Sequence, residues 1–394
     1  MIRKLLRLLG KFILAIIGFN LFLTFVCVPV YDFPETKPFS GPNWHNPYEG
    51  LDSSKWKIGN FQVQSRLFGG VTNGRNNSSS RIFDVYGDLG YDVITISDYM
   101  SINNYCEDDY ACVPMYEHGY GVQKTHQLVF DSPSVTYWDY PLIQTTHTKQ
   151  FILNLIGKDA AMTAIAHPKL RMAYTKSDME QLSGYDLIES ASNFTMSMKQ
   201  WDYALSAGKP AYIISNDDAH DLDEPFDYGR MYTVMNCEDA SKECVFNTLK
   251  SGQSYGVRKR TPSGETHQMK VDRFKDLSVV NHVKFIGDSL NISLSHPVLF
   301  VTFYGQGGDT LKYIHHGERT SVVGYPTKAE DSYVRAEIYL ANGDWVYLNP
   351  IFRYGDELPT MGEAKINWLM TLLIRGLLFI AFALVARWHL KRRK

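Results

Sequence analysis

Two long apolar runs, one at each end of the chain, most constrain what this sequence can fold into. The first covers residues 12–30, FILAIIGFNLFLTFVCVPV, and contains no charged residue. The second covers residues 366–386, INWLMTLLIRGLLFIAFALVA. A helix of about 20 apolar residues spans the hydrocarbon core of a bilayer. The sequence therefore predicts one transmembrane helix at each end, with Arg375 either snorkelling or meeting a polar partner in another membrane helix.

Basic residues beside both runs predict the orientation. They lie on the terminal side of each run, at Arg3, Lys4, Arg7 and Lys11 and at Arg387, Lys391, Arg392, Arg393 and Lys394. Such clusters favour the cytoplasm. We therefore expect a protein of the cytoplasmic (inner) membrane with two spans, both termini cytoplasmic, and the main domain periplasmic or extracellular. A cleaved signal peptide is the alternative for the first run, but Val26-Cys27-Val28-Pro29 lacks small residues for cleavage.

This topology also predicts partners and cysteine chemistry. Membrane lipid is one partner, and the spanning helices offer contacts to other membrane or envelope proteins. The net charge of −2 supplies no basic field, so no nucleic-acid partner is expected. In an oxidising compartment, Cys106 would pair with Cys112 and Cys237 with Cys244. The alternative is four free thiols.

The sequence between the apolar runs divides into three parts. Residues 1–30 and 359–394 hold the two membrane segments, 31–57 predict a linker, 58–258 an α/β domain, and 259–358 a small antiparallel β-domain. Within 58–258, strands are predicted at 61–65, 91–97, 126–130, 162–168, 185–191 and 211–215, and helices at 81–90, 147–157, 177–183 and 198–207. This alternation is typical of a parallel sheet covered by helices. Residues 259–270 predict a solvated linker.

Polar residues that follow the predicted strands suggest a site for a divalent metal. Glu117 and His126 lie in YEHGYGVQKTHQLVF, His167 in AIAHPKL, and Asp218 and His220 in ISNDDAHD. Carboxylates and imidazoles from strand ends can bind such an ion together. Each motif alone is weak, since a His before Pro is often structural and an Asp after a strand is often a helix cap.

At these residues the chain resembles the PHP family, named for polymerase and histidinol phosphatase. The resemblance runs over about 57–258 and rests on LGYDVITISDY, MTAIAHP, YDLIESASN, NDDAHD, and GRMYTVMN with TLKSGQSYGV. It implies a distorted (β/α)7 barrel and a cluster of up to three metals that hydrolyses phosphoesters. The strands of 259–358 are similar to the tail of some membrane or secreted members.

The chain departs from the family pattern at several ligand positions. The first family motif, His-x-His, corresponds here to Gln62, Val63 and Gln64, and the acid that usually follows is missing from FGGVTNG. The second motif ends in Asp98-Tyr99 instead of Asp-His. A neutral amide or phenol is a weaker ligand than imidazole. These departures put two of the three metal positions in doubt.

The resemblance leaves one metal position complete. One position would use Gln62, Gln64, Glu117 and Asp218, and a second would use Tyr99 and His220 with the missing acid. The third would use Glu117, His126 and His167, with Asp218 or His220 as proton acceptor. The expected cofactor is one divalent metal, zinc or manganese, or none. Three functions follow: a pseudoenzyme that serves as an accessory or binding component of a membrane or envelope assembly, a metal-dependent phosphoesterase-type hydrolase, or a module that binds a polar ligand.

Overall fold

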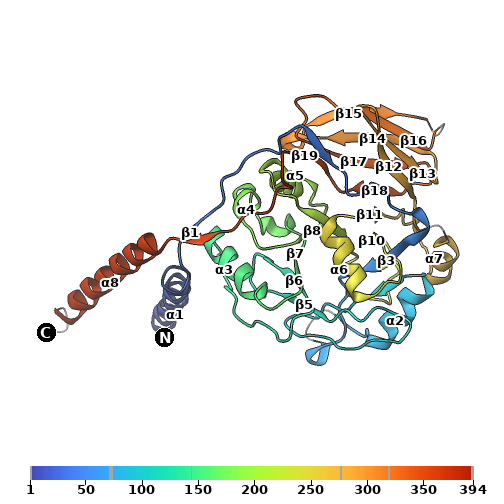
Figure 1. Cartoon of the computed structure of the whole chain (residues 1–394). Helices are drawn as coiled ribbons and strands as arrows, with labels where there is room; N and C mark the ends of the chain where they lie inside the picture. Colours follow the sequence, from blue (N-terminus) through green and yellow to red (C-terminus); the bar gives the residue numbers. More distant parts are fainter. Residues whose placement is uncertain (1, 71–73, 143, 276, 318–319, 392–394) are drawn as a thin grey trace.

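The structure is a computed structural model that describes residues 2–70, 74–142, 144–275, 277–317 and 320–391. It shows a mixed α/β body from one side of which two helices extend (Figure 1). These are α1 (Ile2–Phe22), continued by a π-helical turn at Leu23–Cys27, and α8 (Trp368–Lys391). The basic residues Arg392, Arg393 and Lys394 lie outside the described residues.

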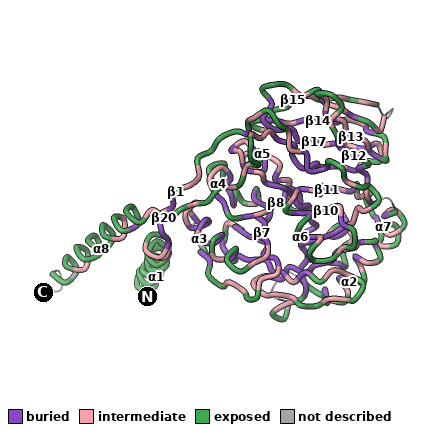
Figure 2. The backbone as a smooth tube through the Cα atoms, viewed as in Figure 1, coloured by how far each residue is buried: buried purple, intermediate pink, exposed green. Residues whose placement is uncertain are grey.

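Both terminal helices are long and apolar enough to cross a membrane. The candidate spans run over Ile2–Cys27 and Trp368–Trp388, and only 11% and 6% of their apolar windows are buried. Figure 2 shows them as mainly exposed, whereas the interior of the body is buried. Burial against the protein therefore does not account for their apolar character. Crossing a membrane would account for it.

The described residues between these helices form four sheets. The ten-stranded sheet runs in the order β15-β14-β17-β18-β11-β10-β3-β4, with β19 and β2 joined to β17. The others are β5-β6-β7-β8-β9, β12-β13-β16 and β1-β20. The strand bounds are β1 Tyr31–Asp32, β2 Asn43–His45, β3 Trp56–Asn60, β4 Val93–Ile94, β5 Met115–His118, β6 Gln127–Phe130, β7 Met162–Ile165, β8 Leu187–Ala191, β9 Tyr212–Ser215, β10 Met231–Asn236, β11 Ser254–Arg258, β12 Val280–Ile286, β13 Ser289–Leu294, β14 Val298–Tyr304, β15 Thr310–His315, β16 Val322–Pro326, β17 Tyr333–Leu340, β18 Trp345–Leu348, β19 Ile351–Tyr354 and β20 Lys365–Ile366.

The helices of the body are α2 Ser79–Asp88, α3 Thr146–Ile156, α4 Lys176–Gln181, α5 Met198–Ser206, α6 Lys242–Ser251 and α7 His267–Arg273. Helices α2 to α5 agree with the predicted positions, whereas α6 and α7 were not predicted. Side-chain caps begin several of them, since Ser78 accepts from the Arg81 N–H and Thr145 from the Thr148 N–H. Gly90, with φ +80°, follows α2 and stops it as predicted.

The strand arrangement is more mixed than a parallel sheet. Strands β7, β8 and β9 pair in parallel, but β5-β6 and β6-β7 are antiparallel. A strand was predicted at 61–65, but β3 ends earlier, at Asn60. Within 61–65, Val63 makes an isolated bridge to Ala219. The predicted (β/α)7 barrel is not confirmed, because β3, β4, β10 and β11 lie in one sheet and β5–β9 in another. Isolated parallel bridges connect the two sheets, at Val63–Ala219 and Tyr99–Glu117.

The C-terminal strands extend a sheet of the α/β part. Strand β18 pairs with β11, from Tyr255–Leu348 to Arg258–Trp345, so β14, β15, β17, β18 and β19 continue the sheet that contains β3 and β4. The segment predicted as a solvated linker, 259–270, begins α7 and places Lys270 in the core with 0% exposure. The segment 31–57, predicted as a linker, contains β1 and β2. The domain division stays a prediction.

One predicted disulfide forms and the other does not. Cys106 and Cys112 are bridged, six residues apart, whereas Cys237 and Cys244 are free. Both free thiols lie near the Thr248 hydroxyl, at 3.4 and 3.9 Å. Burial raises the pKa of the Cys237 thiol to about 12, which keeps it protonated at neutral pH.

We expect reduction of the Cys106–Cys112 bridge to lower the free energy of unfolding by about 2 kcal/mol, because a short closed loop is released. Urea unfolding with and without reductant measures this change. The Cys106→Ala/Cys112→Ala variant serves as the control and should not respond to reductant. An equal response of this variant would contradict the assignment.

Candidate metal centre

Glu117, His126 and His167 converge from three neighbouring strands. Glu117 lies in β5, His126 lies one residue before β6, and His167 lies two residues after β7. These strands are consecutive in the five-stranded sheet, and the pairing of Glu117 with Leu128 fixes the register. One ligand atom from each of the three residues lies within 4.8 Å of the other two.

The three side chains are buried and hydrogen-bonded to one another. The Glu117 Oε1 atom lies 2.5 Å from His126 Nδ1 and 3.3 Å from His167 Nε2. Their exposures are 0%, 1% and 1%. The other ring nitrogens, His126 Nε2 and His167 Nδ1, are buried and have no hydrogen-bond partner among the described residues. Since buried polar atoms are normally paired, these two nitrogens leave the cluster incomplete by itself.

Gln64 and Tyr99, at two of the weakened ligand positions, lie next to this cluster. Gln64 Nε2 donates to Glu117 Oε2 at 2.7 Å. Tyr99 hydrogen-bonds to Glu117, and its ring lies 5.3 Å from that of His126. Gln62 is 0% exposed, and neither of its amide atoms has a partner among the described residues. Gln64 and Tyr99 therefore use their polar groups to hold Glu117. Residues 71–73 of the acid-free FGGVTNG segment lie outside the described residues.

Asp218 and His220 lie beside the cluster, on the loop after β9. The Nδ1–H of His220 donates to the main-chain oxygen of Asp218 at 2.7 Å. Asp218 Oδ1 is buried without a partner among the described residues. Asp218 adopts φ +54° and His167 φ +29°, a region that costs energy for residues other than glycine. Such strained residues gather at functional sites.

Burial and mutual interaction set the charges of this region. Burial opposes ionisation of Glu117, but the two imidazoles outweigh it and lower the pKa of the carboxyl. Burial disfavours the charged form of His167, yet its contacts with Glu117 and Asp218 raise its pKa to about 9. Burial raises the pKa of Asp218 to about 6. Without a metal, the proton on His167 balances the charge of Glu117.

Glu189 is a site residue whose role the sequence left open. It is 0% exposed in β8, accepts from the His167 N–H at 2.9 Å, and accepts from Asn216 Nδ2 at 2.9 Å. Burial raises its pKa to about 8. Glu189 therefore positions His167 through the main chain. The sequence signal for this role is the position of Glu189 within an apolar strand, because a buried acid requires hydrogen-bond or charged partners.

The donor set fits a divalent metal. Two imidazoles and one carboxylate are the protein ligands of many catalytic zinc sites. Their spacing lets one ion replace the hydrogen bonds that Glu117 makes with the two histidines. A metal at the first or second expected position would depend on Gln62, Gln64 and Tyr99, two of which already bond Glu117. The structure thus assembles one good ligand set.

Comparison with known proteins gives a distant structural relative. A two-domain protein from Bacteroides vulgatus, described as containing a predicted PHP-like metal-dependent phosphoesterase, is 13% identical, with a TM-score of 0.41. The alignment covers 85% of this chain and 99% of that chain. No family model matches the sequence, and neither does any curated protein.

Proposed function

We propose that the chain is a membrane-anchored, metal-dependent hydrolase of the phosphoesterase type with one divalent metal, zinc or manganese. The convergence of Glu117, His126 and His167 is the observation that carries this proposal. The hydrogen bonds of the Glu117 carboxylate to both histidines support it, because one ion could replace both contacts. The ester class follows the resemblance of the sequence to the PHP family.

The residues around the cluster have separate roles in this proposal. Glu117, His126 and His167 would hold the metal, which would supply Lewis-acid chemistry for the hydrolysis of an ester. Gln64 and Tyr99 orient the Glu117 carboxylate. His220 can accept a proton from the attacking water at Nε2, because its Nδ1–H is already donated to Asp218. Its side chain is 12% exposed, so it is in contact with solvent.

A non-catalytic binding domain is the second candidate. Two observations favour it. Gln64 and Tyr99 hydrogen-bond to the Glu117 carboxylate, and all three candidate metal ligands are deeply buried. In this case the domain would act as an accessory or binding component of a membrane or envelope assembly. Metal binding without hydrolysis would identify this candidate.

We further propose that both terminal helices span the cytoplasmic membrane, with the body on the far side from the cytoplasm. The length, composition and exposure of the helices support the spans. The basic residues before and after them support the orientation. Cysteine labelling from each side of intact membranes tests this topology. Labelling of a cysteine introduced at exposed Lys284 only from the cytoplasmic side would contradict it.

Metal analysis of the full chain in detergent tests the metal site. We expect one zinc or manganese per chain in the wild type. In Glu117→Gln, which weakens a direct ligand, we expect the metal affinity to fall by about 100-fold or by a larger factor. Glu224→Gln makes the same chemical change on the surface and should bind normally. Equal metal content in wild type and Glu117→Gln would contradict the assignment.

Hydrolysis of a chromogenic phosphate ester tests the activity. We expect His220→Asn to reduce kcat by about 10²–10⁴-fold, the range for loss of a general base, with metal content unchanged. A metal-loaded wild type that hydrolyses no phosphate mono- or diester would instead support the binding domain.

A further inference from the structure

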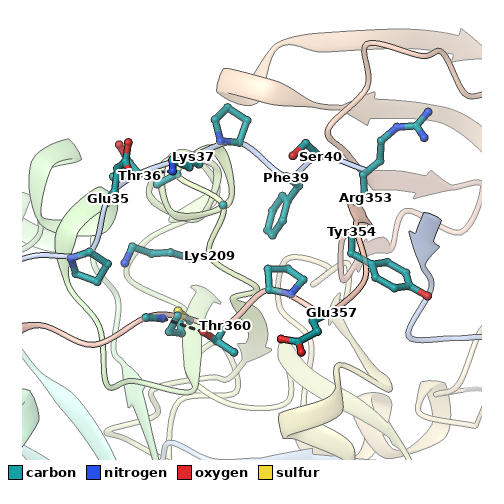
Figure 3. Close-up of a pocket in the computed structure, with 18 of the residues that line it drawn as sticks. Glu35, Thr36, Lys37, Phe39, Ser40, Lys209, Arg353, Tyr354, Glu357 and Thr360 are labelled. Atoms are coloured by element: carbon teal, nitrogen blue, oxygen red, sulfur yellow. Dashed lines mark hydrogen bonds and ion pairs between the residues drawn. The ribbon is translucent and has the colours of Figure 1, made fainter. Parts of the chain in front are cut away.

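A second cavity lies where the two ends of the body meet the terminal helices. Its volume is about 260 Å³, and none of the metal-centre residues lines it. Three segments form it, at 34–40, 207–209 and 353–362, together with Glu180. Figure 3 shows Lys209 extending between the segment that carries Glu35 and Lys37 and the segment that carries Thr360. The cavity is thus built around one lysine.

Local structure holds Lys209 in this position. It follows α5 after Gly208, which has φ +77°. A Cβ at Gly208 would lie 1.9 Å from the Lys37 main-chain oxygen, so only glycine lets the 34–40 segment pack this closely. The Lys209 N–H donates to the Ala204 oxygen at 3.2 Å. These contacts fix the point from which the side chain enters the cavity.

The Lys209 ammonium is buried and has few hydrogen-bond partners. The residue is 3% exposed, and among the described residues its side chain makes one hydrogen bond, to the Gln181 main-chain oxygen at 3.4 Å. An ammonium has three donors, so two remain available. Burial lowers the pKa of Lys209 to about 8, and no carboxylate offsets this effect. A buried cation of this kind requires an anionic partner.

The remaining walls do not supply that partner. Three carboxylates line the cavity, and none of them pairs with Lys209 among the described residues. Glu35 pairs with Lys37 at 2.8 Å, Glu180 pairs with Lys176 at 3.6 Å, and Glu357 is exposed. Arg353 also lines the cavity, but its guanidinium donates to the main-chain oxygens of Asp331 and Lys328. The apolar part of the wall is formed by Pro34, Pro38, Phe39, Pro359 and Met361. The cavity therefore offers one buried cation with few partners in a wall of mixed polar and apolar residues, an arrangement suited to a small anion with an organic body.

The position of the cavity indicates which anion it meets. Pro34 comes two residues after β1, and Gly362 comes three residues before β20. Strands β1 and β20 pair with each other and lead directly into the terminal helices. If these helices span a bilayer, the cavity lies close to the level of the lipid phosphates. Lysine binds phosphate as a compact point charge.

We propose that this cavity binds the phosphate group of a phosphate monoester, from a lipid head group or from a free ester, with Lys209 as its cationic contact. A volume of about 260 Å³ accommodates a head group or a short ester and leaves acyl chains outside. The site is separate from the metal centre, so it supplies a binding function whether or not the chain is a hydrolase.

Binding to the full chain in a maltoside detergent tests the proposal, with EDTA present to remove metal. We expect titration with glycerol 3-phosphate to give saturable binding if the ligand is free. Native mass spectrometry should show retained phosphatidic acid, and not phosphatidylcholine, if the ligand is a lipid. Lys209→Met should weaken whichever binding occurs at least tenfold. Lys284→Met, at an exposed position of β12 outside the cavity, should leave it within about twofold.

Labelling of the wild type gives a readout that does not depend on a variant. Glycerol 3-phosphate or phosphatidic acid should slow the reaction of Lys209 with an amine-reactive reagent, measured by peptide mass spectrometry, and leave Lys37 unchanged. Saturable binding lost in Lys209→Met, or selective protection of Lys209, supports the proposal and names the source. Absence of binding and protection with both probes, or equal binding by Lys209→Met, overturns it.

Discussion

Replacing Arg335 with methionine is expected to lower the free energy of unfolding of the body by about 3–5 kcal/mol, because it leaves the buried Asp202 carboxylate without its cationic partner. Arg335 in β17 is 2% exposed and donates to Asp202 Oδ1 and Oδ2 at 2.7 and 2.5 Å. It also donates to Glu337 at 2.6 Å. The Tyr333 hydroxyl donates to Asp202 at 3.0 Å. This group joins α5 of the α/β part to the C-terminal strands.

Chemical unfolding followed by near-ultraviolet circular dichroism measures the effect. Lys284→Met, which makes the same replacement at an exposed position of β12, should change stability by no more than about 0.5 kcal/mol. Adding Asp202→Leu to Arg335→Met should recover part of the loss, because it removes the orphaned charge. An Arg335→Met variant as stable as Lys284→Met would contradict this account.

Replacing Asp217 with alanine is expected to cost about 3 kcal/mol or more, since three main-chain N–H groups lose their acceptor. Asp217 accepts from the N–H groups of Gly229, Arg230 and Met231 at 2.6, 2.8 and 2.8 Å. Its Oδ2 also accepts from Asn60 Nδ2 and the Tyr86 hydroxyl. The carboxylate ties the loop that carries Asp218 and His220 to the start of β10.

Chemical unfolding measures the loss of stability. The rate of phosphate ester hydrolysis measures whether the loop that carries Asp218 and His220 still supports activity. Asp217→Asn keeps one acceptor oxygen and should lie between the wild type and Asp217→Ala. Asp223→Ala, which removes an exposed carboxylate paired with Arg81, should cost no more than about 1 kcal/mol. If Asp217→Ala and Asp223→Ala are equally stable, the five hydrogen bonds do not hold the loop.

The sequence predicted the strands that precede His167 and Asp218 because they are local, but it did not predict β5, which carries Glu117. The strand before His167 and the strand before Asp218 are short apolar runs, and they form as β7 and β9. The capping residues of α2 and α3 are visible in the sequence for the same reason. Convergence of Glu117 with the two histidines needed the family resemblance, since spacing along the chain does not specify which strands become neighbours.

The sequence could not predict contacts between distant segments. Strand β2 pairs with β19, with His45 opposite Phe352, and no local pattern links these positions. Lys270 appeared solvated because lysine is seldom buried, yet the main-chain oxygens of Pro225 and Tyr228 accept from its ammonium. Gln62 and Gln64 alternate with apolar residues as in a strand, but the chain there forms one isolated bridge, between Val63 and Ala219, in place of a strand. Such outcomes depend on tertiary packing.

The short ladder between β1 and β20 has a mechanical consequence. Tyr31 lies opposite Ile366 and Asp32 opposite Lys365, and Val30 bonds both Asn367 and Thr371. This ladder therefore couples the two terminal helices to each other where they enter the body. Sliding of one terminal helix past the other would shear the ladder. Pro34 and Gly362 line the cavity and lie within three residues of β1 and β20, so such a movement would reach the cavity walls before it reached the metal ligands.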